Sequence, residues 1–214
     1  MKVRPILLLL LLAGVVGVLC WMYYAVTRPA LVRHTHRGDE VIADLDACGR
    51  HKRVKSVQYD HFAEIAKAER HYPAAALFRA MALSERVQEQ HCAWVIERMG
   101  GSYRPPQRMM IFRGTTAGNI ARSIAVEERS SDTLYREQIG RHLHLGNRMA
   151  ARALIWAAAA DLRHRLLLEA YQADRMVEGT RYLVCPRCGN IYLHTACDRY
   201  CPHCLTDSRR FIGR

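Results

Sequence analysis

Four cysteines near the C-terminal end constrain the folding of this chain more than any other feature. They lie in the stretch CPRCGNIYLHTACDRYCPHC, residues 185–204, as two Cys-x-x-Cys pairs separated by twelve residues. Each pair presents two thiolates to one tetrahedral ion, and Pro186 and Pro202 stiffen the two turns. The sequence therefore predicts a metal site formed by Cys185, Cys188, Cys201 and Cys204.

The spacing of these cysteines does not distinguish iron from zinc, because a tetrahedral all-sulfur site suits both. Iron would make an electron-transfer centre, and zinc would make a structural ribbon. A segment as short as residues 178–214 cannot build a sufficient core alone, so the ion is expected to hold it together. The other cysteines are scattered singles, which argues against a disulfide framework.

The start of the chain predicts a membrane anchor. An uncharged run extends from Pro5 to Val26, with aromatic residues at its C-terminal end. It is long enough to cross a bilayer as a helix. A cleaved signal peptide is the alternative, because basic residues precede the run. We assign residues 1–27 to a single-pass anchor and 28–44 to a linker. Basic residues flank the run on both sides, so the orientation in the membrane stays open.

The formal net charge of +12 is spread along the chain. There is no arginine-rich arm and no helix-turn-helix pattern, so nucleic acid is not an expected partner. A basic protein beside anionic lipid headgroups is the simpler explanation. The expected partner is therefore the membrane.

Between residues 45 and 177 the apolar residues recur with the period of a helix, and no stretch alternates as a strand would. Glycines and prolines separate the helical segments, as in Gly100-Gly101. The four expected helices span about residues 44–70, 73–99, 115–146 and 147–176. Two helix pairs joined by a longer crossover predict a four-helix bundle of the ferritin-like kind.

The second and fourth helices look like copies of each other. Superposing Glu85 on Asp161 places Gln88 on His164, and most apolar positions then coincide. An acid followed three residues later by histidine puts both side chains on one helix face. Bundles use this spacing to direct a carboxylate and an imidazole at a shared metal.

On these motifs the chain resembles the rubrerythrins over residues 45–214. The matching segments are YPAAALFRAMALSE, GNRMAARALIWAAAAD with the following His164, YLVCPRCGN and CPHC. The resemblance implies an all-α, ferritin-like bundle over residues 45–177, followed by a rubredoxin-like module over 178–214. It also implies a non-haem iron oxidoreductase that reduces hydrogen peroxide at a di-iron site in the bundle.

The ligand positions implied by the resemblance are kept only in part. Lys52, Gln88 and Ser130 stand at three of them. If Lys52 points inward, its ammonium is expected to pair with Glu85 and Glu127 where metal charge once stood. These replacements argue against iron in the bundle. One ion held by the remaining residues is the alternative. The positions that keep a plausible ligand are Glu85, Glu127, Asp161 and His164.

Two functions follow from the sequence. The first is a membrane-anchored rubrerythrin-like metalloprotein, with peroxide reduction or electron transfer through a rubredoxin-type iron and impaired di-iron activity. The second is a non-catalytic scaffold or binding subunit of a membrane complex, with a structural zinc. Rubrerythrins usually associate through the bundle, so the resemblance also implies a homodimer. The sequence identifies no electron donor.

Overall fold

The computed structural model describes residues 14–23, 36–175 and 179–213. The chain divides into two units, Met1–Thr35 and His36–Arg214. In the first unit residues 14–23 are helical, and their side chains are exposed. None of the helices in the described ranges is long and apolar enough to cross a membrane. The rest of the predicted anchor, residues 1–13 and 24–27, lies outside the described residues.

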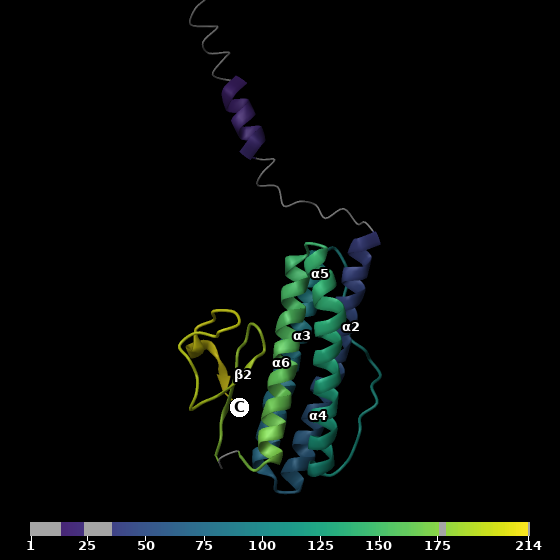
Figure 1. The fold of residues 1–214 in the computed structure, drawn as a ribbon, viewed down its shortest axis with the longest axis vertical. Helices are drawn as coiled ribbons and strands as arrows, with labels where there is room; N and C mark the ends of the chain where they lie inside the picture. The colour runs from purple at the N-terminus through teal and green to yellow at the C-terminus, as the bar shows by residue number, and fades with distance from the viewer. Residues whose placement is uncertain (1–13, 24–35, 176–178, 214) are drawn as a thin grey trace, which may run out of the picture. The chain divides into compact units, whose positions relative to one another are not determined.

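The second unit is a helical bundle with a small module at its C-terminal end. In Figure 1 the long helices lie side by side, and the loop between α3 and α4 runs the length of the bundle. This crossover between two helix pairs is the topology predicted from the sequence. The helices are α2 (His36–Ala68), α3 (Tyr72–Arg98), α4 (Thr116–Thr133), the π-helical η1 (Leu134–Ile139), α5 (Gly140–His144) and α6 (Arg148–Gln172).

Local capping explains where two of these helices begin. The Thr115 side chain accepts a hydrogen bond from the backbone N–H of Gly118 at 3.3 Å, which caps α4. Asn147 accepts from the N–H of Ala150 at 3.0 Å and caps α6. Gly100 follows α3 with φ +83°, a left-handed position that glycine adopts without strain.

Two predicted boundaries are wrong. Helix α2 begins at His36 rather than near Asp44, because Val41 and Leu45 are buried against the ends of other helices. Long-range packing therefore extends the helix through residues that look like a linker. Helix α6 ends at Gln172, and Asp174 rather than Gly179 takes the left-handed position after it, with φ +53°.

The apolar core has two clusters separated by a polar layer. Phe62 of α2 and Phe78 of α3 belong to one cluster, whereas Leu45 and Ile96 belong to the other. Between these positions in α2 lies Lys52, which is 0% exposed. The middle of the bundle is therefore charged, with apolar packing toward each end.

The C-terminal module is a three-stranded antiparallel sheet in the order β2-β1-β3. Its strands are β1 (Tyr182–Val184), β2 (Ile191–Leu193) and β3 (Ile212–Gly213). Val184 pairs with Ile191 on one side and Ile212 on the other. Tyr182, Val184 and Ile191 share a core cluster with helix α3. The module is therefore packed on the bundle by its own apolar residues.

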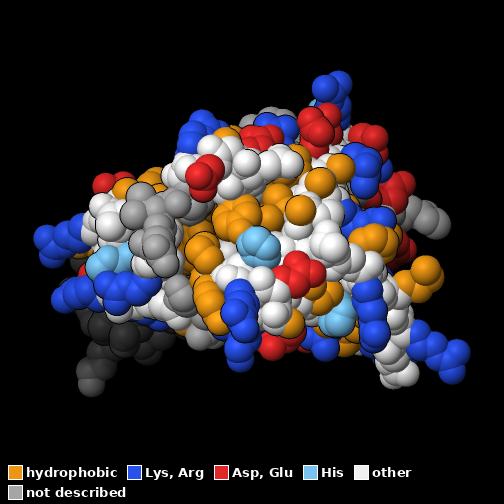
Figure 2. Space-filling model, turned by 90° about the horizontal axis from the view of Figure 1, so that it is seen from below, with side chains coloured by type: hydrophobic (Ala, Val, Ile, Leu, Met, Phe, Trp, Pro, Cys, Tyr) orange, Lys and Arg blue, Asp and Glu red, His pale blue; other side chains and the backbone are white. Residues whose placement is uncertain are grey.

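Charge on the surface follows the sequence pattern. On the face shown in Figure 2, lysine and arginine side chains are scattered among acidic and apolar ones. Several arginines are also paired, as in Arg86 with Asp60 at 2.6 Å. This face therefore carries its positive charge in dispersed form.

Candidate metal centres

The four predicted cysteines converge in the module. The sulfurs of Cys185 and Cys204 are 3.4 Å apart, and those of Cys188 and Cys201 are 3.5 Å apart. All four sulfurs lie within 4.8 Å of one another. One tetrahedral ion bound by four thiolates brings its sulfurs to about this separation. The residues present therefore fit a single iron or zinc ion.

Two similar turns set this geometry. Gly189 after the first pair has φ +79°, and its N–H donates to the carbonyl of Cys185 at 3.0 Å. Leu205 takes the equivalent place after the second pair with φ +59°, and its N–H donates to the carbonyl of Cys201 at 2.8 Å. A leucine rarely adopts this conformation. Its side chain is 77% exposed, so it meets no obstruction there.

The surroundings of the sulfurs favour a thiolate at Cys185 but raise the pKa of Cys188. A hydrogen bond from Cys188, together with backbone N–H groups, lowers the pKa of Cys185 to about 5. The hydroxyl of Tyr192 lies 3.1 Å from the sulfur of Cys201. The Tyr192 ring stacks on Phe211 with 5.2 Å between centroids, which fixes that hydroxyl. Metal ligation requires deprotonated cysteines, and the hydrogen bonds of this environment favour deprotonation at Cys185.

The second predicted ligand set meets in the middle of the bundle. The imidazole Nδ1 of His164 lies 3.2 Å from Oε1 of Glu85 and 3.2 Å from Oε1 of Glu127. The ligand atoms of these residues and Asp161 lie within 4.8 Å of one another, and all four side chains are buried. The sequence treats them as a remnant of a larger set. In the structure they form one intact carboxylate–histidine cluster.

Two lysines of α2 enter this cluster. Lys52 contacts Asp161, and its Nζ is 3.3 Å from Glu85. Lys55 Nζ is 2.7 Å from Glu85, 2.7 Å from Asp161 and 2.5 Å from Glu127. The predicted ion pair of Lys52 with Glu85 is confirmed. The predicted pair of Lys52 with Glu127 is wrong, because Lys55 forms the ion pair with Glu127. The spacing of three residues, which places both lysines on one helix face, could have identified Lys55.

The cluster is held together by its own charges. Burial by itself lowers a lysine pKa, yet the carboxylates of Asp161 and Glu85 leave the pKa of Lys52 raised. The pKa of Lys55 is raised more strongly. Burial opposes ionisation of Glu85, but the two ammonium groups bring its pKa down to about 2. The two lysines therefore stay charged, and so does Glu85.

Two residues that replace metal ligands of the rubrerythrin pattern form hydrogen bonds instead. Ser130 donates to Oδ2 of Asp161 at 2.7 Å. Gln88 does not reach the cluster, and instead its amide donates to Ser84 at 3.2 Å. Glu128, adjacent to Glu127, lies outside the cluster on the surface. Tyr59, which the sequence does not identify as a site residue, donates its hydroxyl to Glu127 at 2.5 Å.

A short hydrogen-bonded path links the two sites. Ser84 donates to the carbonyl of Gly189 at 2.6 Å, so its oxygen is free to accept from Nε2 of His164 at 2.8 Å. The indole N–H of Trp156 on α6 donates to the carbonyl of His203 at 3.2 Å. Both cysteine turns are therefore tied to the bundle helices, the first next to Cys188.

The metal-ligand side chains in the bundle can be compared with the ligands that a di-iron site uses. Ferritin-like di-iron sites use a glutamate from each of two helices and a Glu-x-x-His pair from each of the others. Here three carboxylates and one imidazole are present, together with two ammonium groups. This donor set is consistent with one iron ion once the ammonium groups move away. These donors are fewer than that pattern supplies.

No family model and no curated protein matches the sequence. Among solved structures, the chain is similar to nigerythrin in a mixed-valence state, with 20% identity and a TM-score of 0.72. It is also similar to fully reduced, all-ferrous nigerythrin, with 22% identity and a TM-score of 0.71. Each match covers 81% of this chain and 86% of the other. The chain therefore has a nigerythrin-like and rubrerythrin-like fold, a helical bundle with a C-terminal four-cysteine module.

Proposed function

We propose that this protein is a rubrerythrin-like metalloprotein that transfers electrons through one iron at the four-cysteine site and has no di-iron centre in its bundle. The absence of a di-iron centre is inferred from the position of Lys52 and Lys55. Their ammonium groups lie among the ligand atoms of the carboxylate cluster. Two irons would compete with two fixed positive charges at the same carboxylates, which is electrostatically unfavourable.

Exposure of the four-cysteine site supports electron transfer. Three of its cysteines are buried, but Cys204 is half-buried and the adjacent Leu205 is 77% exposed. A redox partner can therefore approach the ion closely at the second turn. The nigerythrin structures, described as fully reduced, partially reduced and mixed-valence, belong to a protein whose iron changes oxidation state.

A structural zinc in a scaffold protein is the second candidate. Both cysteine turns are hydrogen-bonded to the bundle through Ser84 and Trp156, so an ion there would also fix the module in place. The lysines favour this alternative as well, because an electron donor without a metal acceptor in its own bundle has little use. The ion would then stabilise a surface that binds another protein.

Metal content distinguishes these functions. The protein is produced in medium containing both iron and zinc, purified in air, and measured by elemental analysis with a visible spectrum. We expect one iron per chain and thiolate-to-iron absorption that dithionite bleaches. One zinc and no colour would select the scaffold, whereas about three irons per chain would contradict the account of Lys52 and Lys55.

We further propose that residues 5–26 attach the protein to a membrane as a single span. The uncharged run supports this, and within it the apolar side chains of Val15, Leu19 and Trp21 are more than half exposed in the described helix. The test compares the full chain with a variant that begins at His36. The full chain should stay with membranes after carbonate extraction and the variant should not. Release of both by carbonate would refute the span.

A further inference from the structure

Helices α2 and α4 make few contacts with each other, and two cavities lie between them. The first has a volume of about 340 Å³ and is bordered by Ala47 and η1. The second has a volume of about 390 Å³ and is bordered by Phe62 and the crossover loop. His51 and Val126 line both cavities, which therefore form one groove along α2. None of the described metal-ligand residues lines this groove, so it is separate from the two metal sites.

The lining of the groove carries charge of one sign. Among the described residues it includes four lysine and arginine side chains and no aspartate or glutamate. Lys52 and Lys55 are already paired with the carboxylates of the bundle cluster. The other two cations, Arg122 and Arg129 of α4, form no ion pair in the part of the chain that the structure describes. The groove therefore presents positive charge that an anionic ligand would neutralise.

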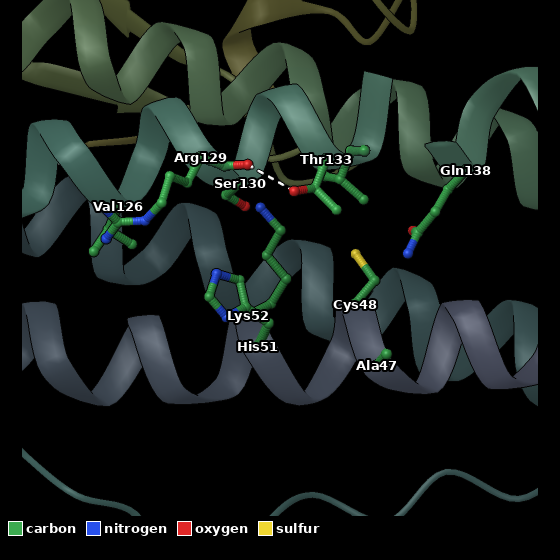
Figure 3. A pocket seen from close by; sticks show the side chains of 10 residues that line it. Ala47, Cys48, His51, Lys52, Val126, Arg129, Ser130, Thr133 and Gln138 are labelled. Carbon is green, nitrogen blue, oxygen red and sulfur yellow. Dashed lines mark hydrogen bonds between the residues drawn. The ribbon is translucent and has the colours of Figure 1, made fainter. Parts of the chain in front are cut away.

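Figure 3 shows the first cavity from close by. The Arg129 side chain runs beside Val126, and the His51 imidazole is directed from α2 toward α4. A guanidinium and an imidazole N–H can donate hydrogen bonds to the same carboxylate, and such charge-assisted bonds are among the stronger ones. The point where the two cavities join is therefore suited to an acidic head group.

The second cavity is mainly apolar and is covered by the crossover loop. Its apolar and aromatic lining consists of Val54, Tyr59, Phe62, Met110, Ile111 and Phe112. The side chain of Gln58 donates to the carbonyl of Phe112 at 2.8 Å and accepts from its N–H at 2.7 Å. The guanidinium carbon of Arg122 lies 3.4 Å from the centre of the Phe112 ring. The loop is therefore fastened to α2 on one side of the groove and to α4 on the other.

We propose that this groove binds a long-chain fatty acid. The carboxylate lies between Arg129 and His51, and the chain extends beneath the loop to Phe62. The apolar walls favour a hydrocarbon chain over a small inorganic anion, and the unpaired arginines favour an acid over an alcohol of the same length. The site is one that neither the metal centres nor the proposed electron transfer uses.

The dimensions of the groove agree with this ligand. Helix α2 rises by about 16 Å from His51 to Phe62, at about 1.5 Å per residue. One acyl chain covers half of a hydrocarbon core about 30 Å thick, which is about 15 Å. The volumes of the two cavities, about 340 and 390 Å³, also fall within the range of about 300–1,000 Å³ that is usual for ligand sites. A single chain therefore reaches from the head group to the end of the second cavity.

The test uses the full chain with zinc at the four-cysteine site, mixed with phosphatidylcholine vesicles that contain a photoreactive palmitate. The probe carries a diazirine near the end of its chain. After irradiation, peptide mapping should find the label in α2 between Val54 and Phe62 and in residues 110–112. Excess palmitate should remove this label, whereas hexadecanol, which lacks the carboxylate, should not. Label that is found only in residues 5–26, or that hexadecanol removes as well as palmitate does, would overturn the proposal.

Two variants examine the head group and the chain separately. Arg129→Gln should reduce the labelling of α2 about tenfold, since it removes a charge-assisted hydrogen bond. The control Arg98→Gln changes an exposed arginine at the end of α3 and should leave the labelling unchanged. Val54→Trp should prevent labelling because it fills the second cavity. Circular dichroism checks that all three variants are folded, and unchanged labelling in Arg129→Gln or in folded Val54→Trp would contradict the site.

Discussion

Lys52 and Lys55 supply, from one face of α2, the positive charge that three buried carboxylates need. An unpaired charge in such a place is costly, so each lysine is held by at least two carboxylates. Ser130 and Tyr59 satisfy further oxygens of the same groups. A cluster of this kind is stable while every member is present and becomes costly when one is removed.

Replacing Lys52 by methionine tests this dependence. Lys52→Met leaves Glu85 and Asp161 with less compensation in a fully buried position. We expect the free energy of unfolding to fall by about 3–5 kcal/mol in urea denaturation followed by circular dichroism. The matched control is Lys67→Met, an exposed lysine in the last turn of α2, with an expected loss below about 1 kcal/mol. Similar losses in both variants would show that Lys52 is not buried in an ion-paired cluster.

The same cluster predicts sensitivity to acid. The pKa of Glu85 is lowered to about 2 in the folded state, and the pKa of Asp161 is lowered as well. The two carboxylates therefore stabilise the fold above their unfolded pKa values, and this stabilisation is lost as the pH falls toward the folded pKa values. Glu127 acts in the opposite direction because its pKa is raised. We expect the free energy of unfolding to decrease from pH 5 to pH 3, and Glu85→Gln to flatten that decrease. An unchanged slope in the variant would contradict the assignment.

At the scale of elements, the first cysteine turn and helix α3 fit together closely. A Cβ at Gly189 would lie 2.9 Å from the carbonyl oxygen of Ser84 and 3.1 Å from Gln88. Gln88 therefore serves the contact between module and bundle, although the rubrerythrin pattern places a metal ligand at its position. Helix α3 holds the turn on one side, and an ion bound by the cysteines would hold it on the other.

Two glycines with nearly equal φ angles allow the effect of backbone strain to be distinguished from the effect of a close side-chain contact. Gly189 has φ +79° and Gly179 has φ +78°, but a Cβ at Gly179 would meet nothing within 4 Å. Both alanine variants should lose about 1 kcal/mol from backbone strain. Gly189→Ala should lose about 1–3 kcal/mol more from overpacking, and should release its metal faster to a chelator. The measurements are thermal unfolding and metal release, and equal behaviour of the two variants would refute the close contact.

At the scale of the whole unit His36–Arg214, the two sites differ in their need for metal. The bundle carries its own cations and two apolar clusters. The module has three short strands, and hydrogen bonds lower the pKa of its Cys185. Its folding is therefore expected to depend on the ion.

Removal of the metal tests this difference. After treatment with a strong chelator under reducing conditions, far-ultraviolet circular dichroism should keep its helical signal, because the bundle does not use the ion. Limited trypsin digestion should now cleave at arginines of the module such as Arg181, Arg199 and Arg210. Cys185→Ser with Cys201→Ser should behave in the same way without a chelator. A collapse of the helical signal would show instead that metal holds the bundle together.

The features that could be predicted from the sequence are those that depend on residues close together in the chain. The spacing of the cysteines was enough to predict the four-cysteine cluster, since each turn forms within a few residues. Helical periodicity located most helix ends to within a few residues for the same reason, but not the start of α2. The four carboxylate and histidine positions were found only through the resemblance and the internal repeat.

Other features became visible only in the folded chain. Lys55 in the cluster and the path from His164 through Ser84 to Gly189 both join segments far apart in sequence. Which side chains meet there depends on the rotation and relative height of each helix, and these are set by packing across the whole bundle. The sequence by itself determined which elements form and which ligand types they carry. Tertiary packing decided that the cations facing the bundle carboxylates are the chain's own lysines.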